Sequence, residues 1–157
     1  MAAVVTSRFL FVVSGKTWLH LAEDGKGAVS VYLRGSNGAL TAATGSPYPL
    51  PSVGYALALD PKKQFLYVTS RGYICGFRID SDGTLTAVPG SPLPAANFPL
   101  GIAVDPSGSF VYTPNYDANN VSGYTIAKHG SLTMMPTSPF AAGQQPIGIA
   151  ITNSVSK

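Results

Sequence analysis

The chain is a succession of short apolar runs, each bounded by glycine, proline, asparagine or aspartate. No run places its apolar residues at helical spacing, whereas four to six apolar residues between turn signals are typical of β-strands. Several runs are apolar at every position, which favours a sheet that is packed on both faces. The pattern predicts an all-β chain with about twelve strands and no helix longer than about one turn.

The apolar runs recur in three copies with the same internal order. Each copy contains an aromatic strand, a strand of small residues that ends in an aromatic residue, a Gly-x-Leu-Thr segment and a Ser-Pro pair. The spacing is 45 residues from Leu40 to Leu85 and from Phe65 to Phe110, and 47 residues from Leu85 to Leu132. A period of about 40–45 residues with four strands per unit is typical of β-propeller blades.

We name the four antiparallel strands of each predicted blade A to D, from the inner to the outer position. The A strand is a small-residue run such as Gly101–Val104, and the B strand is an aromatic run such as Phe65–Thr69. The C strand ends in an aromatic residue such as Phe77, and the D strand begins at Leu-Thr. The expected blades cover residues 8–50, 54–96 and 100–143 of a single partial propeller spanning residues 1–157.

The two ends of the chain are expected to share one blade. Ala2–Val5 lacks the Gly-Ile-Ala pattern of an A strand, so the first copy is expected to begin at its B strand, Phe9–Val13. Gly148–Ile151 has that pattern and would be a lone fourth A strand, with unpaired backbone donors and acceptors. We therefore expect residues 147–152 to complete the first blade of another chain.

Three blades cannot close a ring, because propellers contain about four to eight. A homodimer in which two chains form one six-bladed ring satisfies this limit and closes the head-to-tail contact. The alternative is that these residues are the C-terminal part of a seven-bladed protein.

The aromatic strands also resemble those of a known family. The residues in question are Phe65-Leu66-Tyr67-Val68-Thr69-Ser70 and Phe110-Val111-Tyr112-Thr113-Pro114-Asn115, the second preceded by Gly-Ile-Ala-Val-Asp-Pro-Ser-Gly. They resemble the YVTN-repeat propellers, a group that is similar to the 6-phosphogluconolactonase-like lactonases with seven blades. The resemblance covers nearly the whole chain. It implies a propeller fold and, as a possible activity, hydrolysis of a lactone.

Charge and apolar content exclude several classes of partner. The net charge is +3, but the cations are dispersed and only Lys62 and Lys63 are adjacent, so no nucleic-acid partner is expected. No apolar run approaches the length of about 20 residues that spans a membrane.

The N-terminal apolar stretch is interrupted by Arg8 and is interpreted as a strand rather than a signal peptide. A complete chain of this kind would be cytoplasmic, and the compartment is otherwise open.

The loops between B and C strands are the best candidates for a binding site, because they emerge on one face of a propeller beside the channel mouth. The first such loop is 11 residues longer than its counterpart and holds the only tryptophan and the only glutamate of the chain. The unusual residues on this face are Trp18, His20, Glu23, Arg71, Tyr73, Tyr116 and Asp117.

Two functions remain open for this face. His20, Glu23 and Arg71 could act as a base, an acid and an oxyanion-stabilising cation in lactone hydrolysis, with Trp18, Tyr73, Tyr116 and Asp117 binding the ligand. Alternatively, the loops are solvated and the chain is a non-catalytic scaffold that binds a partner. No cofactor is expected, and no cluster of residues has metal-ligand spacing. Cys75, which replaces Ser30 and Ser122 of the other copies, is predicted to be a buried structural thiol.

Overall fold

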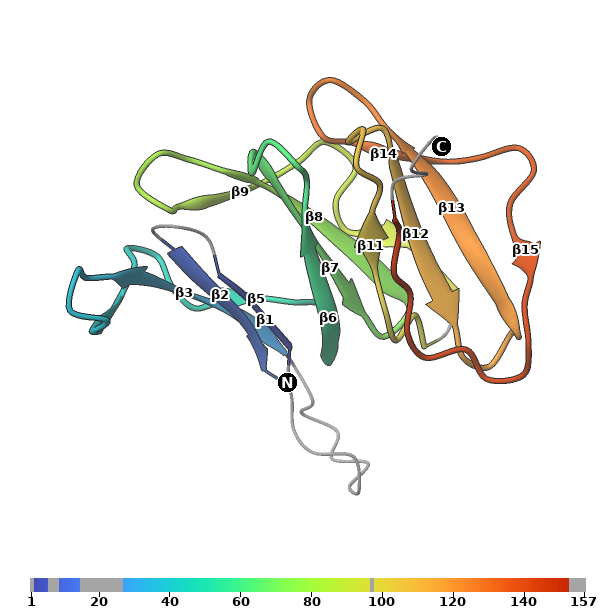
Figure 1. Cartoon of the computed structure of the whole chain (residues 1–157), viewed down its shortest axis with the longest axis horizontal. Coiled ribbons are helices and arrows are strands. Elements are labelled where there is room, and N and C mark those ends of the chain that lie inside the picture. Colours follow the sequence, from blue (N-terminus) through green and yellow to red (C-terminus); the bar gives the residue numbers. More distant parts are fainter. Residues whose placement is uncertain (1, 6–8, 15–26, 97, 153–157) are drawn as a thin grey trace.

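The protein consists of three antiparallel sheets that stand side by side (Figure 1). The computed structural model describes residues 2–5, 9–14, 27–96 and 98–152. Fifteen strands and no helix occur in these ranges, so the all-β prediction is confirmed. Nor do these ranges contain an apolar helix of the length that a membrane crossing requires.

Each sheet is one copy of the sequence repeat, and its strands follow the chain order. The first sheet contains β1 (Ala2–Val5), β2 (Phe9–Ser14), β3 (Ala28–Arg34), β4 (Leu40–Ala42) and β5 (Tyr48–Pro49). The second contains β6 (Gly54–Leu59), β7 (Phe65–Ser70), β8 (Tyr73–Ile79), β9 (Leu85–Ala87) and β10 (Leu93–Pro94). The third contains β11 (Ala103–Val104), β12 (Phe110–Asn115), β13 (Asn120–Ile126), β14 (Leu132–Met134) and β15 (Phe140–Ala141).

The outer strand of every sheet is divided into two short segments, which accounts for fifteen strands where about twelve were expected. Both segments pair with the C strand, and the Ser-Pro pair lies between them. In the gap, the serine hydroxyl oxygen accepts a hydrogen bond from a C-strand backbone N–H. The three bonds are Val31 N to Ser46 Oγ at 2.9 Å, Gly76 N to Ser91 Oγ at 3.0 Å and Gly123 N to Ser138 Oγ at 3.0 Å. The repeated serine therefore satisfies a donor that the interrupted strand leaves open.

The turn between the A and B strands is fixed by an aspartate. Asp105 Oδ1 accepts hydrogen bonds from the backbone N–H groups of Ser109 at 2.8 Å and Phe110 at 2.7 Å. Asp60 holds the equivalent turn of the second sheet, accepting from Phe65 N at 2.6 Å. An aspartate that accepts from backbone groups further along the chain stabilises a tight turn, which explains the repeated Asp-Pro.

The expectation that Ala2–Val5 does not form an inner strand is wrong. β1 pairs antiparallel with β2, from Ala2 opposite Val13 to Val5 opposite Leu10. The pairing uses backbone N–H and C=O groups, which every residue other than proline carries, so the Gly-Ile-Ala pattern is not required for it. The inner position of the first sheet, which we expected residues 147–152 of another chain to fill, is occupied by β1 in this structure.

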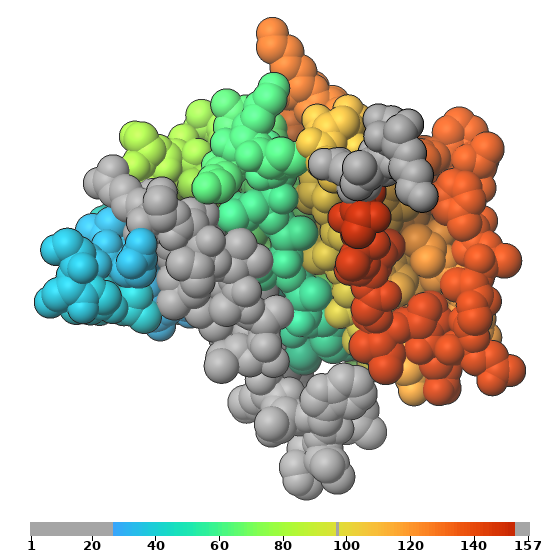
Figure 2. Space-filling model, in the orientation of Figure 1, coloured from blue at the N-terminus to red at the C-terminus, as the bar shows by residue number. Residues whose placement is uncertain are grey.

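Residues 146–152 also differ from the expectation, because they form no strand. They lie beside the start of the third sheet, where the Ile147 carbonyl oxygen is 2.8 Å from the position that a Cβ atom on Gly101 would take. In Figure 2 this C-terminal segment, in red, lies on the surface next to the third sheet. The segment therefore lies close to the chain that enters β11, and no strand pairs with it among the described residues.

Two apolar cores fill the spaces between neighbouring sheets. The core between the first and second sheets contains Val29, Val31, Leu66, Val68 and Cys75. The core between the second and third sheets contains Tyr67, Ile74, Ile102, Val111 and Tyr124. Consecutive β7 residues alternate between the two cores, so both faces of the middle sheet are buried, as the continuous apolar pattern of its B strand predicts.

The second and third sheets are joined by a contact at the turn before β14. The Tyr67 hydroxyl donates a buried hydrogen bond to the Gly130 carbonyl oxygen at 2.9 Å. A Cβ atom on Gly130 would lie 2.5 Å from the Phe65 ring, and Gly130 has a φ of 87°. Only glycine satisfies both the close approach and the left-handed backbone at this position.

We expect Tyr67→Phe to lower the free energy of unfolding by about 1–2 kcal/mol, because it leaves the Gly130 carbonyl without its buried donor. Tyr48→Phe is the matched control, since the Tyr48 hydroxyl donates to the Thr44 carbonyl oxygen at an exposed site. Urea unfolding measures both losses. A loss for Tyr48→Phe as large as that for Tyr67→Phe would contradict a special role for the bond between sheets.

We expect the Cys75 thiol to be unreactive while the protein is folded. Cys75 is 2% exposed, and burial raises its pKa to about 12. Because the thiolate is the reactive form, labelling by a disulfide reagent at pH 8 is expected to be slower by a factor of about 1,000 in the folded than in the unfolded protein. Stoichiometric labelling of the folded protein within seconds would show that the thiol is not buried.

Candidate functional site

The turns between B and C strands and the linkers that enter the A strands meet at one end of the sheets. Backbone hydrogen bonds tie each turn to a linker. Arg71 N donates to the Val53 carbonyl at 3.0 Å, and Tyr116 N donates to the Phe98 carbonyl at 3.1 Å. Because the same connection is made in successive repeats, the turns are held at fixed positions relative to the inner strands.

Arg71 lies over an aromatic ring that comes from the next linker. Its guanidinium carbon is 4.7 Å from the centroid of the Phe98 ring, which is within cation–π distance. Phe98 has a φ of 54°, an uncommon value for a bulky residue. Arg71 itself is exposed, so the ring fixes the position of a guanidinium that solvent and solutes can reach.

The ring of Tyr55, at the start of β6, contacts the Phe98 ring. Its ring centroid is 6.2 Å from that of Phe98, with an angle of 31° between the planes. Burial raises the pKa of the Tyr55 phenol, the positive charge of Arg71 opposes this rise, and the negative charge of Asp117 adds to it. The phenol is therefore protonated at neutral pH and can donate a hydrogen bond. We call Tyr55, Arg71, Phe98 and Asp117 the Arg71 cluster.

Only some of the residues expected at this face belong to the Arg71 cluster. The charges of Arg71 and Asp117 both influence the pKa of Tyr55, and the backbone N–H of Tyr116 donates a hydrogen bond to the linker. Tyr73 begins β8 opposite Ser70, and among the described residues no ring contact joins it to the cluster. Trp18, His20 and Glu23 lie outside the described residues.

Tyr55 and Phe98 were not among the residues expected at this face, although the sequence carries a signal for both. The positions equivalent to Tyr55 in the other copies are Leu100 and Ile147. The positions equivalent to Phe98 are Val53 and Gln145. An aromatic residue at a position where the other copies have none is a departure from the repeat that the sequence alone shows.

A buried asparagine supports the turn that carries Tyr116 and Asp117. Asn115 Nδ2 donates to Asn120 Oδ1 at 2.7 Å and to Ser122 Oγ at 2.8 Å, so its side chain bridges the two strands that flank the turn. Its own Oδ1 is buried without a partner. The network restrains the exposed turn that carries Tyr116 and Asp117.

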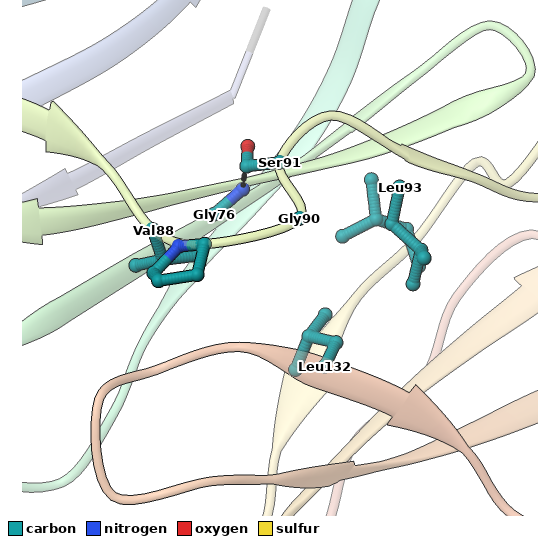
Figure 3. Close-up of a pocket in the computed structure, with 8 residues that line it drawn as sticks. Gly76, Val88, Gly90, Ser91, Leu93 and Leu132 are labelled. Carbon is teal, nitrogen blue, oxygen red and sulfur yellow. Dashed lines mark hydrogen bonds between the residues drawn. The ribbon is translucent and has the colours of Figure 1, made fainter.

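Two other kinds of site are not supported by the described part of the chain. No group of three or more His, Cys, Asp or Glu side chains there could hold a metal ion. A small hollow lies between Leu93 and Leu132, lined mainly by apolar groups and by the Val88–Ser91 turn (Figure 3). It is part of the contact between the second and third sheets and carries no charged group.

The Arg71 cluster combines a positioned cation, a phenol donor and two aromatic rings at an exposed end of the sheets. A guanidinium binds carboxylate or phosphate oxygens through several N–H groups. Aromatic rings pack against the apolar face of a flat or cyclic ligand. The arrangement is therefore suited to a small anionic ligand that carries hydroxyl or carbonyl oxygens.

Solved structures share this fold at low sequence identity. A protein of unknown function from Desulfotomaculum acetoxidans matches with a TM-score of 0.75 and 18% identity, covering 96% of this chain and 45% of that protein. A periplasmic gluconolactonase from Pseudomonas aeruginosa matches with a TM-score of 0.69 and 21% identity over 90% of this chain and 39% of the enzyme. A putative 6-phosphogluconolactonase from Bacteroides uniformis matches with a TM-score of 0.61 and 13% identity over 93% and 55%.

The chain thus spans between 39% and 55% of the length of these solved structures. No curated protein sequence matches it. The sequence does match a family profile, that of the lactonase seven-bladed β-propellers, over residues 10–146. The profile match and the three antiparallel sheets together confirm the propeller fold predicted from the repeat. The chain belongs to the lactonase family of seven-bladed β-propellers.

Proposed function

We propose that this chain is a binding module of the lactonase type, whose Arg71 cluster holds an anionic sugar lactone or the corresponding sugar acid. The observation that carries the proposal is the Arg71 guanidinium, which lies 4.7 Å from the centroid of the Phe98 ring, itself 6.2 Å from the Tyr55 ring. Similarity to solved structures suggests the ligand class, because the names of the gluconolactonase and the putative 6-phosphogluconolactonase given above refer to enzymes that open sugar lactones to anionic sugar acids.

Each group of the cluster has a separate task in binding. Arg71 pairs with the carboxylate or phosphate, and the Phe98 ring keeps the guanidinium from turning freely into solvent. The Tyr55 phenol donates to a ring or carbonyl oxygen, and the exposed part of its ring contacts the C–H groups of the sugar. Asp117 accepts from sugar hydroxyl groups and disfavours a second negative charge on its side of the site.

Binding is tested by calorimetric titration with 6-phosphogluconate and, separately, with gluconate, both of which are stable products of lactone opening. We expect Arg71→Ala to weaken binding by about tenfold or more, the loss typical of a charged hydrogen-bond partner. Arg78→Ala is the matched control, because Arg78 is exposed, pairs with Asp80 and lies at the opposite end of β8. Equal weakening by both variants would mean that only net charge matters, and no binding by the unmodified protein would exclude the proposal.

The second candidate function is lactone hydrolysis, which the family membership favours. In that case Arg71 would stabilise the oxyanion formed when water attacks the lactone carbonyl, and His20 and Glu23 would act as base and acid. These two side chains come from the long first B–C loop and would have to reach the Arg71 cluster. The binding module needs no contribution from His20 or Glu23.

Hydrolysis is tested with a panel of six-carbon sugar lactones, with and without a 6-phosphate, against the spontaneous rate in buffer. If the chain is an enzyme, His20→Ala and Glu23→Ala are each expected to lower kcat by about 100-fold, the contribution typical of a general acid or base, while product binding is retained. No rate above the spontaneous one for any lactone would exclude the hydrolase and leave the binding module intact.

A further inference from the structure

The end of the sheets that carries the Arg71 cluster holds few charges. Among the described residues it has one cation, Arg71, and one anion, Asp117, and both side chains are exposed. The other cations of the described part belong to the opposite end, in or next to the A–B and C–D turns: Arg34, Lys62, Lys63, Arg78 and Lys128. The loop between β2 and β3, which lies outside the described residues, contains two lysines, one glutamate and one aspartate, so its formal charge is zero.

Arg71 and Asp117 do not neutralise each other as an ion pair, because no such pair joins them among the described residues. Asp117 is nevertheless held at the cluster. The backbone N–H of the preceding residue, Tyr116, donates to the carbonyl oxygen of Phe98, whose ring lies against the Arg71 guanidinium. The charges of Arg71 and Asp117 also act on the same phenol, that of Tyr55. A ligand beside this phenol therefore meets one positive and one negative group.

The described residues at this end offer no partner for a second anionic group. Phosphate groups are commonly held by several cations or by the N-terminal N–H groups of a helix. The described part of the chain contains no helix, and Arg71 is its one cation at this end. In a six-carbon sugar acid that carries both a carboxylate and a phosphate, one group pairs with Arg71 and the other lies without a cation, within reach of the Asp117 charge. The mismatch arises in either orientation of the ligand.

We propose that the Arg71 cluster is selective for sugar acids whose only anionic group is the carboxylate, and that Asp117 determines this selectivity. The selectivity rests on the function proposed above and narrows it, since phosphorylated and unphosphorylated ligands were both compatible with that function. The carboxylate pairs with Arg71, and hydroxyl groups of the uncharged part of the ligand donate to Asp117. A second anionic group on the ligand replaces this favourable contact by repulsion between like charges.

The selectivity is measured by calorimetric titration with three six-carbon ligands. Gluconate has one carboxylate, glucarate has a second carboxylate at C6, and 6-phosphogluconate has a phosphate there, which is largely dianionic above a pH of about 7. We expect gluconate to bind most tightly. Glucarate and 6-phosphogluconate are each expected to bind about three- to tenfold more weakly, the effect of one like-charge pair a few ångströms apart in a solvent-exposed site.

Asp117→Asn removes the negative charge without changing the size of the side chain, and it is expected to reduce the preference for gluconate by the same factor of about three to ten. Asp82→Asn is the matched control, since it removes one negative charge from an exposed turn at the opposite end of β8. Asn37 occupies the equivalent turn position of the first sheet. Its Oδ1 accepts from Ala39 N at 3.0 Å, as Asp82 Oδ1 accepts from Thr84 N at 2.9 Å, so the control variant keeps its turn and should keep the preference.

Salt separates repulsion between charges from a difference in ligand shape. The Debye length falls from about 10 Å at 0.1 M salt to about 3 Å at 1 M, so the preference for gluconate over glucarate should largely disappear at the higher concentration. A preference that salt leaves unchanged would be steric and would overturn the role of Asp117.

The remaining outcomes distinguish the selectivity from the function on which it rests. If the unmodified protein binds glucarate or 6-phosphogluconate more tightly than gluconate, the selectivity is wrong and the binding module stands. Equal effects of Asp117→Asn and Asp82→Asn would show that net charge, rather than the position of Asp117, sets the preference. If none of the three ligands binds, the binding module itself is excluded, and the selectivity with it.

Discussion

The middle sheet of this protein is apolar on both faces, and its requirement for burial on two sides governs how the sheets pack. Consecutive β7 residues enter the cores on either side of it. Such a sheet cannot be stable alone in water, since covering one face leaves the other exposed. The repeat is therefore both the unit of sequence and the reason that the units must stack.

Stacking also decides which parts of each repeat can vary. The Asp60 and Asp105 turns and the Ser-Pro interruptions satisfy backbone groups within their own sheet, so they recur almost unchanged. The glycine of the turn before the outer strand recurs at positions 38, 83 and 130 with a φ of 84°, 88° and 87°, and at Gly130 it also allows Phe65 and Tyr67 of the neighbouring sheet to approach closely. Neither constraint applies to the side chains of the B–C turns. They are held by backbone hydrogen bonds to the linkers, which leaves their side chains free to differ between repeats and to form a site.

The period, the strand types and the buried thiol could be predicted because they depend on properties that each residue carries locally. β1 could not, since its pairing rests on backbone groups that leave no pattern in Ala2–Val5. Residues 146–152 show the opposite case: the Gly-Ile-Ala pattern is present, but a strand forms only where a second strand offers its edge. Tyr55 and Phe98 are 43 positions apart, and their contact depends on how two linkers converge and on the left-handed backbone at Phe98.

The position of the Arg71 cluster favours one of the two functions proposed for this face. Tyr55 and Arg71 come from the second sheet, Phe98 from the linker that follows it and Asp117 from the third, so the cluster is complete at a single seam. Binding of an anion there requires only the relative position of two neighbouring sheets, which the Tyr67–Gly130 contact fixes. Acid–base chemistry would also need His20 and Glu23, which belong to the loop between β2 and β3 and lie outside the described residues. A binding module is therefore the function that demands least beyond the packing already present, and hydrolysis depends on where that loop lies.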